Sequence, residues 1–232
     1  MTGPHVRAAL VGRGRMGRAV EALAAEHGVE VVAVLGRGDA VDAGSLGGAD
    51  VAVEFTEPAA ALANLRACAA AGCPVVVGTT GWGGPTDALR AELVRAGARA
   101  LWAANFSLGV NALLGAVGRL AAALGAAGFA PHLIETHHAA KKDAPSGTAI
   151  ALADAAAIDG AAPAITSVRV GSVPGTHTLL FEAPFEQVRL THEARDRRVF
   201  ASGALVAARW LAAPRAPGLY SMQDVLAPEA AQ

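Results

Sequence analysis

The stretch from residue 134 to 150, IETHHAAKKDAPSGTAI, places two histidines, two lysines and a carboxylate directly before Pro-Ser-Gly-Thr. His137 can donate or accept a proton near neutral pH, because the unperturbed pKa of histidine is about 6.5. Lys141 follows four residues later and can supply positive charge or a proton. Gly147 and Thr148 open a predicted helix, whose first N–H groups form an anion site. The stretch therefore predicts a proton-transfer site for a carboxylate-bearing substrate.

The alternative is that this stretch is an ordinary polar loop. His137 and His138 would then be loop residues without a role, and the lysines would face water. A single histidine would favour that interpretation, but the combination of His-His-x-x-Lys with Pro-Ser-Gly-Thr favours chemistry. Within the stretch, Lys142 is interpreted as solvated and Asp143 as a residue that shapes the turn.

A second candidate site lies near the N-terminus, where GRGRMG fits the pattern G-x-G-x-x-G. It follows a predicted strand at 6–12 and opens a predicted helix at 15–28, which is the context that a dinucleotide-binding turn requires. The first glycine allows the tight turn, the second lets the backbone approach a pyrophosphate, and the third lets the helix pack on the strand. The predicted cofactor-binding residues of this turn are Gly12, Arg13, Gly14, Arg15, Met16 and Gly17. A glycine-rich turn without a ligand is the weaker alternative.

The residues after the next predicted strand, at 29–36, bear on the choice of cofactor. An NAD site usually has an acidic residue there, which binds the ribose hydroxyl. This chain has Gly36 and Arg37 instead. An arginine without a neighbouring carboxylate suits a 2′-phosphate, so the pattern favours NADPH, although Arg37 could be solvated and Asp39 could reach the ribose.

The first half continues as an alternation of strands and helices. A further strand is predicted at 49–56, and the segments 73–82 and 98–107 are each predicted as a strand that runs into a loop. Helices are predicted at 59–71 and 85–97. Such an alternation predicts a Rossmann-type, doubly wound parallel sheet, with strand 29–36 buried. Ligands bind beyond the carboxyl ends of such strands. Two loops fall there, and they add these predicted cofactor residues: Gly78, Thr79, Thr80, Ala104, Asn105, Phe106 and Ser107.

The second half has a different pattern, which predicts a second domain. After a long helix, strands are predicted at 132–138, 165–171, 176–194 and 197–203, and helices at 146–158, with Ser146 as N-cap, and at 206–212. Many strands with few helices indicate an α+β domain with a mixed or antiparallel sheet. We therefore predict a dinucleotide-binding domain at 1–106 and a substrate domain at 107–212. The tail, 213–232, is expected to pack back on the first domain.

Composition excludes several classes of protein. Hydrophobic residues make up 53% of the 232 residues and the net charge is -1, so the chain has ample material for a core and lacks the basic excess of a nucleic-acid-binding protein. Cys68 and Cys73 lack metal-ligand spacing and read as buried thiols of a reducing compartment. No metal site, signal peptide or membrane span is predicted, and the expected location is the cytoplasm.

The sequence closely resembles the dihydrodipicolinate reductase (4-hydroxy-tetrahydrodipicolinate reductase) family. The matching segments occur in the family's order: GRMG (14–17), GTTGW (78–82), AANFSLGVN (103–111), ETHHAAKKDAPSGTA (135–149), VPGTH (173–177) and HEARDRRVFASGALVAARWL (192–211). They span nearly the whole chain. The block HH-x-x-K-x-DAPSGTA is far more specific than the glycine motif.

The resemblance implies NADPH- or NADH-dependent reduction of a dihydrodipicolinate-type cyclic dicarboxylate in lysine and diaminopimelate biosynthesis, with hydride passing to ring C4. It implies that His137 is the proton donor or acceptor and that Lys141 is a second proton donor. The residues implied to hold the substrate carboxylates are His138, Lys141, Gly147, Thr148 and Thr80. The resemblance also implies that the sheet of the second domain assembles a homotetramer.

The chain departs from the family pattern at three points. The glycine turn is one residue shorter than the usual G-x-x-G-R-M-G, the acidic residue after the second strand is Gly36, and EFT at 54–56 replaces the usual DFT. Two other functions are compatible with parts of the sequence. A catalytically silent dinucleotide-binding sensor would have no need of the His-Lys pair, and another Rossmann oxidoreductase would not explain the HH-x-x-K-x-DAPSGT block.

Overall fold

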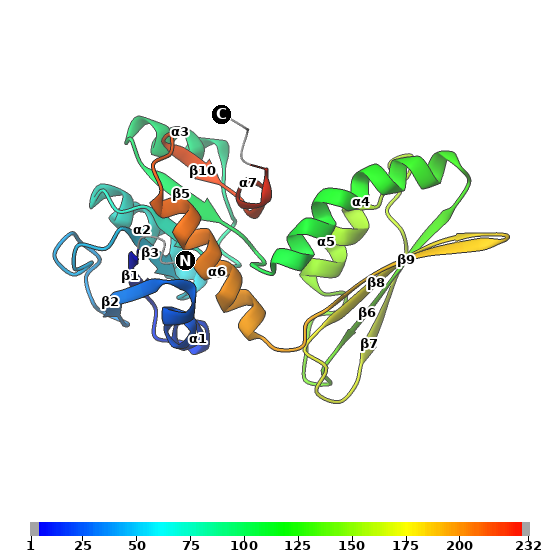
Figure 1. Ribbon diagram of the computed structural model, residues 1–232, viewed down its shortest axis with the longest axis horizontal. Coiled ribbons are helices and arrows are strands. Elements are labelled where there is room, and N and C mark those ends of the chain that lie inside the picture. Colours follow the sequence, from blue (N-terminus) through cyan, green and yellow to red (C-terminus); the bar gives the residue numbers. More distant parts are fainter. Residues whose placement is uncertain (1–4, 229–232) are drawn as a thin grey trace. The chain divides into compact units, whose positions relative to one another are not determined.

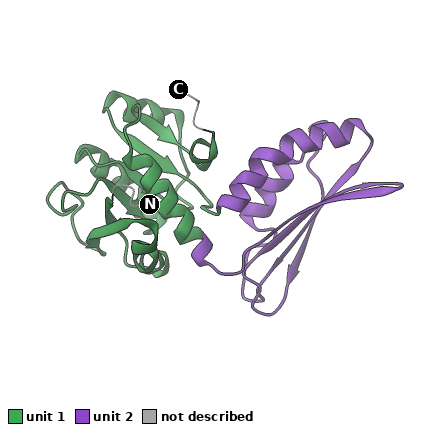
Figure 2. Ribbon diagram, in the orientation of Figure 1, with its two compact units in different colours: residues 1–107, 200–232 green, residues 108–199 purple. Residues whose placement is uncertain are grey.

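The computed structural model of the chain describes residues 5–228 and divides into two compact units. Unit 1 contains the described residues up to 107 and from 200 onward, and unit 2 contains residues 108–199 (Figure 2). Each unit has its own sheet and its own hydrophobic core. The outermost parts of the predicted first domain and tail, residues 1–4 and 229–232, lie outside the described residues.

Unit 1 is built on a six-stranded parallel sheet in the order β10-β5-β4-β3-β1-β2 (Figure 1). Its strands are β1 (Val6–Val11), β2 (Val29–Leu35), β3 (Val51–Glu54), β4 (Val75–Val77), β5 (Arg99–Trp102) and β10 (Gly218–Tyr220). The central strands are short apolar runs, and β3 and β4 are buried along their whole length. Such runs suit parallel strands that are covered on both faces.

The helices of unit 1 connect these strands in the manner of a doubly wound fold. They are α1 (Arg15–Leu23), α2 (Pro58–Ala70), α3 (Asp87–Arg95), most of α6 (Arg198–Ala212) and α7 (Met222–Leu226), with a 3-10 turn at Ala25–His27. Strand order reverses beside β1, because β2 lies on one side and β3, β4 and β5 lie on the other. Right-handed connections therefore place α1 on the opposite face from α2 and α3. The predicted doubly wound parallel sheet is confirmed.

Strand β2 differs from its prediction as a buried strand. Val29 and Leu35 are buried, but residues 31–34 between them are only half-buried. The reason is its place in the sheet, since among residues 5–228 β2 pairs with β1 alone and its other edge is unpaired. The pattern of β-branched residues predicted the strand correctly but could not tell an edge position from a central one.

Unit 2 contains a four-stranded mixed sheet in the order β7-β6-β8-β9. The strands are β6 (Ala130–His137), β7 (Ile165–Arg169), β8 (Thr176–Ala183) and β9 (Glu186–Glu193). The β6–β7 pair is parallel, and the β6–β8 and β8–β9 pairs are antiparallel. The predicted mixed sheet is confirmed.

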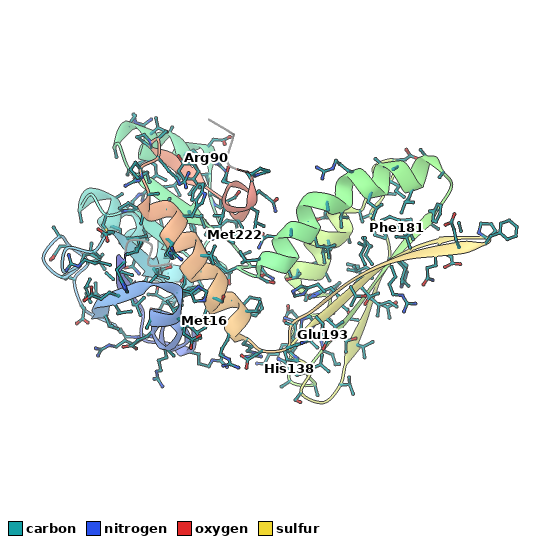
Figure 3. All side chains as sticks on the ribbon, in the orientation of Figure 1. Met16, Arg90, His138, Phe181, Glu193 and Met222 are labelled. Atoms are coloured by element: carbon teal, nitrogen blue, oxygen red, sulfur yellow. The ribbon has the colours of Figure 1, made fainter. Side chains whose placement is uncertain are left out.

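Helices α4 (Leu108–Ala126) and α5 (Gly147–Ala155) pack against one face of that sheet. Phe181 lies between the sheet and these helices, together with Val117, Leu133 and Leu179 (Figure 3). Helix α4 is long and apolar enough to cross a membrane, which alone is weak evidence, and its packing on α5 gives it a place in this core.

Helix α6 overturns one prediction, because residues 197–203 were expected to form a strand and instead open this helix. Ala201, Ala204, Leu205 and Ala208 are all fully buried, at the three- and four-residue spacing of a helix face. This period outweighs the strand preference of the Val-Phe pair. The helix also needs Gly203, where a Cβ atom would lie 1.7 Å from the carbonyl oxygen of Phe106.

The tail joins unit 1 through β10, which pairs in parallel with β5. The pairing begins with the backbone N–H of Gly218, which donates to the carbonyl of Ala98 at 2.9 Å. Helix α7 follows, and Ser221 and Asp224 form a capping box at its start. The tail therefore extends the sheet at the edge opposite β2.

Candidate active site

The glycine turn after β1 is shaped by close packing. Gly12 has a φ of 117°, and a Cβ atom there would lie 2.0 Å from the carbonyl oxygen of Phe55. A Cβ atom on Gly17 would lie 2.0 Å from the carbonyl oxygen of Gly12. These two positions accept only glycine, so the turn lies tightly against β3 and α1 lies tightly on the turn.

The start of α1 fits an anionic ligand. Gly14 is the N-cap, and among the described residues nothing beyond its own chain neighbours lies within 4 Å of where its Cβ would be. No side chain among the described residues caps this helix, and no acidic residue lies in its first turn. Arg13 and Arg15 are exposed on either side of Gly14, and Met16 is half-buried. The open backbone, the free N–H groups and the two guanidinium groups suit a pyrophosphate, despite the shorter turn.

Residues after β2 show how Arg37 is placed. Its guanidinium lies 3.1 Å from a carboxylate oxygen of Glu57, and both side chains are largely exposed. Asp39 accepts a hydrogen bond from the backbone N–H of Gly36 at 2.7 Å, so that carboxylate closes the turn. An exposed ion pair is weakly held, so Arg37 can exchange Glu57 for a phosphate.

The loop after β4 is braced by its neighbours. The hydroxyl of Thr79 accepts a hydrogen bond from the backbone N–H of Thr56 at 2.7 Å, and the carbonyl of Thr79 accepts from the indole of Trp82 at 2.8 Å. Thr79 is buried, whereas Thr80 is exposed. Gly78 packs against the ring of Phe55. Thr79 thus fixes the loop, and Thr80 is the side chain that a ligand can reach.

The loop after β5 likewise contains both buried and exposed residues. Ala104 is exposed, and the side chain of Asn105 accepts a hydrogen bond from the backbone N–H of Ser107 at 2.8 Å. Phe106 and Ser107 are buried, and the ring of Phe106 packs edge-on against that of Phe55, with centroids 5.8 Å apart. The glycine turn and the loops after β4 and β5 all follow carboxyl ends of strands in one sheet, as predicted.

In unit 2, the sheet brings the ionisable residues to one end. Strand β6 ends at His137, its parallel neighbour β7 ends at Arg169, and these two residues are paired in register. Strand β8 runs antiparallel to β6, so its first residues, which include His177, lie at the same end. Figure 3 shows His138 and Glu193 at this end as well. Residues that are far apart in sequence thus form one cluster.

A buried carboxylate holds His137. Glu135 has no exposed surface and contacts the Nδ1 atom of His137 through one oxygen, while its other oxygen accepts from Arg169 at 2.7 Å. Burial alone would raise the pKa of Glu135, but hydrogen bonds from Arg169, Ser167 and His137 outweigh it and lower the pKa to about 2. Glu135 is therefore ionised near neutral pH.

The surroundings of His137 set its proton affinity. Burial lowers the pKa of His137, the Glu135 carboxylate raises it, and the cations Lys141 and Arg169 lower it; the net direction is downward. A dicarboxylate bound beside the imidazole would raise this pKa, because it adds negative charge. The histidine can therefore gain a proton when substrate binds and give it up during the reaction.

A second histidine lies against the ring of His137. The rings of His137 and His177 meet edge to face, with centroids 5.2 Å apart and planes 75° apart. Burial lowers the pKa of His177 to about 4, so this ring is neutral near pH 7. Its Nε2 atom lies 3.1 Å from the hydroxyl of Ser146, and that hydroxyl accepts from the backbone N–H of Ala149. The predicted role of Ser146 as the N-cap of α5 is confirmed.

The remaining predicted substrate residues surround this cluster. The Nζ atom of Lys141 lies 2.8 Å from both carboxylate oxygens of Asp143, so Asp143 positions this lysine in addition to shaping the turn. The Nε2 atom of His138 lies 2.9 Å from a guanidinium nitrogen of Arg197. A guanidinium group only donates, so this nitrogen of His138 accepts. Lys142 is exposed.

The start of α5 adds a site for a carboxylate. Gly147 and Thr148 are its first residues, and the space around the position of a Cβ atom on Gly147 is open to 4 Å. No acidic residue lies in the first turn of this helix. Its first N–H groups and the nearby cationic side chains therefore suit a carboxylate.

The same cluster has residue types that could bind a metal ion. Potential ligand atoms of Glu135, His137 and His177 lie within 4.8 Å of one another. However, both oxygens of Glu135 are already engaged, one by His137 and one by the cationic Arg169. A guanidinium beside the carboxylate opposes a second positive charge. The arrangement therefore suits proton transfer rather than metal binding.

Sequence reasoning missed three members of this cluster, namely Glu135, Arg169 and His177. A signal existed for Glu135, since it lies two residues before His137 and alternate residues of a strand share a face. His177 lies in the segment VPGTH, which was noted only as part of the resemblance. Arg169 had no signal, because its place depends on the register between β6 and β7.

The fold and the site define a dinucleotide-dependent oxidoreductase with a separate α+β unit that carries a proton-transfer cluster. Two family models match the chain: "Dihydrodipicolinate reductase, N-terminus" over residues 6–106 and "Dihydrodipicolinate reductase, C-terminus" over residues 109–226. The chain therefore belongs to the dihydrodipicolinate reductase family, whose members are NADH- or NADPH-dependent oxidoreductases of lysine and diaminopimelate biosynthesis.

Individual relatives cover nearly the whole chain. The 4-hydroxy-tetrahydrodipicolinate reductase of Thiobacillus denitrificans is 40% identical over an alignment of 267 positions, gaps included. The alignment covers 95% of this chain and 98% of the relative. The enzyme of the same name from Stenotrophomonas maltophilia is 44% identical over 230 residues, with coverage of 92% and 94%. A dipicolinate-bound dihydrodipicolinate reductase from Paenisporosarcina sp. TG-14 is 24% identical, with a TM-score of 0.76 and coverage of 95% and 99%, and it supports the same fold.

Proposed function

We propose that this chain reduces the cyclic dicarboxylate formed from 4-hydroxy-tetrahydrodipicolinate by loss of water, giving tetrahydrodipicolinate. The observation that carries the proposal is the cluster of His137, Lys141 and the start of α5 at one end of the sheet of unit 2. It combines a proton donor, cations and a helix N-terminus, which are the groups that a dicarboxylate undergoing reduction requires. Family membership supports the same reaction.

The dinucleotide site is assigned to unit 1. The backbone of Gly12 to Gly17 would hold the pyrophosphate at the start of α1, and Arg37 would pair with a 2′-phosphate in place of Glu57. The exposed members of the loops after β4 and β5, Thr80 and Ala104, would line the site. When bound, NADPH or NADH supplies the hydride that reduces the substrate at ring C4.

The substrate carboxylates are assigned to unit 2. Lys141, held by Asp143, would pair with one carboxylate, and the N–H groups and hydroxyl at Gly147 and Thr148 would hold the other. His138 would add a further contact from the end of β6. Thr80 of unit 1 is retained as a predicted substrate ligand.

His137 is assigned the proton transfer. Hydride addition to a conjugated imine builds negative charge, which a nearby acid must neutralise. His137 lies at the end of β6 among the cations that attract the substrate, and the bound carboxylates would favour its protonated form. Lys141 is the second proton donor.

We also propose a homotetramer that works in the cytoplasm. The face of the four-stranded sheet opposite α4 and α5 has no covering element within residues 108–199. It displays Ile134, Leu180 and Val168 between threonines, and Val168 is 37% exposed. A sheet face of this kind suits pairing with a second copy of the chain.

The direct test couples the upstream synthase to this protein and follows oxidation of NADPH and of NADH. We expect oxidation with at least one of them, and a turnover in His137→Gln that falls far more than the affinity for the dinucleotide. Absence of oxidation with both cofactors would contradict the proposal. An unchanged turnover number in His137→Gln would remove this residue from the reaction.

A further inference from the structure

We propose that Glu135 and Arg169 are a positioning pair for His137, which fixes the ring so that Nδ1 keeps its hydrogen and Nε2 exchanges the proton with the substrate. The inference rests on the proposed function, because it assigns roles within the same site. Neither residue was singled out by the sequence, and neither lies in the HH-x-x-K-x-DAPSGTA block.

The first step is the contact between Glu135 and His137. The two side chains lie on the same face of β6, and the exposed fractions of these residues are 0% and 8%. A carboxylate oxygen of Glu135 contacts the Nδ1 atom of His137. An ionised carboxylate only accepts hydrogen bonds, so Nδ1 must donate. The neutral imidazole then has its lone pair on Nε2, and Nε2 is the atom that gains and loses a proton.

The second step is the anchoring of Glu135. Its other oxygen accepts from Arg169 at 2.7 Å, and the same guanidinium nitrogen donates to the carbonyl of Asp143 at 2.6 Å. Arg169 therefore ties the carboxylate to the loop that carries Lys141. Since Arg169 and His137 hold one oxygen each, the carboxylate cannot rotate without breaking a charge-assisted hydrogen bond.

The third step concerns charge. Glu135 stays ionised, because the hydrogen bonds that it accepts outweigh burial and lower its pKa to about 2. It therefore orients His137 without taking the proton itself. The charged or titratable groups that face His137 are Glu135 on β6, Lys141 in the following loop, Arg169 on β7 and His177 on β8. Glu135 is the only anion among them.

The fourth step is the packing around Nε2. Gly175 has a φ of 154°, and a Cβ atom there would lie 2.9 Å from the Nε2 atom of His137. The glycine therefore lets the backbone lie beside this ring edge without a side chain. On another side the ring of His177 packs edge-on against His137. The imidazole is thus held by a hydrogen bond at Nδ1 and by packing at its other edge.

The test replaces the carboxylate by an amide in Glu135→Gln. Arg169 only donates, so the amide oxygen must face Arg169 and the amide NH2 must face Nδ1 of His137. This arrangement requires a lone pair on Nδ1 and moves the hydrogen to Nε2, which is the wrong tautomer. We expect the turnover number to fall roughly 100-fold, while the Kd for NADPH is unchanged. Glu186→Gln, an exposed site at the β8–β9 turn, is the matched control and should keep full turnover.

Two further readouts separate positioning from a merely structural role. The limb of the pH–turnover profile that reports His137 should move to lower pH by about one unit in Glu135→Gln, because a neighbouring negative charge is lost. In 15N NMR of the wild-type protein above the pKa of His137, its neutral ring should carry the hydrogen on Nδ1. This measurement needs no variant, so it decides the matter even if Glu135→Gln does not fold.

The outcomes are distinct from those of the proposed function. If the wild-type protein is active and Glu135→Gln keeps its turnover and its pH profile, Glu135 does not position His137. A wild-type His137 whose neutral form carries the hydrogen on Nε2 would also overturn the inference. Wild-type protein without any reductase activity would instead contradict the proposed function.

Discussion

Lys141 and Lys142 are neighbours in sequence but differ in how firmly they are held. Lys141 is half-buried and bridges to both oxygens of Asp143 at 2.8 Å, whereas Lys142 is exposed. The pKa of Asp143 is lowered, first of all by its hydrogen bond from Lys141, so this carboxylate stays ionised. A side chain that is already ordered loses less entropy when it binds a substrate carboxylate.

The two lysines therefore provide a matched test at the scale of one residue. We predict that Lys141→Ala lowers kcat/KM by about 100-fold, because it removes both a carboxylate partner and a proton donor. Lys142→Ala should leave kcat/KM at the wild-type value. Equal effects of the two substitutions, measured by NADPH oxidation, would contradict the assignment of Lys141.

Arg37 bears on the choice between the two cofactors. Its partner Glu57 is exposed, so the ion pair contributes little and can be replaced by a phosphate. We predict that Arg37→Ala weakens binding of NADPH by about tenfold and changes binding of NADH little. Arg66→Ala, which removes an arginine that pairs with Glu92 elsewhere in unit 1, is the control. Titrations in which both cofactors weaken equally would show that Arg37 does not bind the 2′-phosphate.

At the scale of elements, the sequence predicted most of the fold because its periodic patterns are local. Apolar runs predicted strands β1 to β5 of unit 1, whereas β10 in the tail was not predicted as a strand. The failure at residues 197–203 has a tertiary cause, since the buried face of α6 and the contact of Gly203 with Phe106 are invisible without the fold. The edge position of β2 is likewise a property of the whole sheet.

The candidate site likewise divides into residues that the sequence predicted and residues that only the fold brings together. Residues in one continuous block, His137 to Thr148, could be recognised from their types and spacing. Arg169 comes 32 positions after His137 in sequence. The two residues lie side by side because β6 and β7 pair in a register that places them opposite each other. His177 depends on the antiparallel pairing of β8. The groups that we propose to act chemically were thus visible in the sequence, whereas most of those that we propose to orient them were not.

The burial of His177, on β8 beside β6, predicts how the stability of the fold depends on pH. The pKa of His177 is about 4 in the folded protein, below its ordinary value of 6.5, so between these values the unfolded state binds more protons. The stabilisation from the neutral ring is therefore complete above pH 6.5 and is lost as the pH falls towards 4. It amounts to up to about 3 kcal/mol. Glu135 adds a loss at lower pH, since its pKa of about 2 lies below its ordinary value of 4.5.

Urea denaturation across this pH range checks the prediction. The urea concentration at the unfolding midpoint of the wild-type protein should decrease as the pH is lowered from 6.5 to 4. The variant His177→Gln, which has no group to titrate, should show a smaller fall. His27→Gln, which removes a histidine of unit 1, should behave like wild type. If His177→Gln keeps the full dependence on pH, the neutral ring of His177 is not its cause.

At the scale of the whole molecule, the proposed function divides the chemistry between the two units. In this proposal, unit 1 binds the hydride donor at the start of α1, and unit 2 supplies the proton donor and the carboxylate site. The sheet of unit 2 has two different faces, since Glu135 and His137 point to the face covered by α4 and α5, and Ile134 points to the other. In our proposal, this one strand therefore serves catalysis on one face and assembly on the other.

Ile134→Lys tests the assembly. It places a charge at the centre of the uncovered face, where it would be desolvated in an interface. We predict a species of lower mass by light scattering, whereas Val94→Lys, at a site in α3 that is 56% exposed, should keep the wild-type mass. Wild-type mass in Ile134→Lys, or a monomeric wild-type protein, would contradict a tetramer formed through this face.

The central claim is that hydride passes from the dinucleotide to ring C4 of the dicarboxylate. The most direct measurement supplies NADPH that carries deuterium at both C4 positions and follows the product of the coupled reaction by mass spectrometry. The account predicts one deuterium per molecule of tetrahydrodipicolinate, located at C4, with one NADPH oxidised for each. Oxidation of NADPH without deuterium in the product would contradict it.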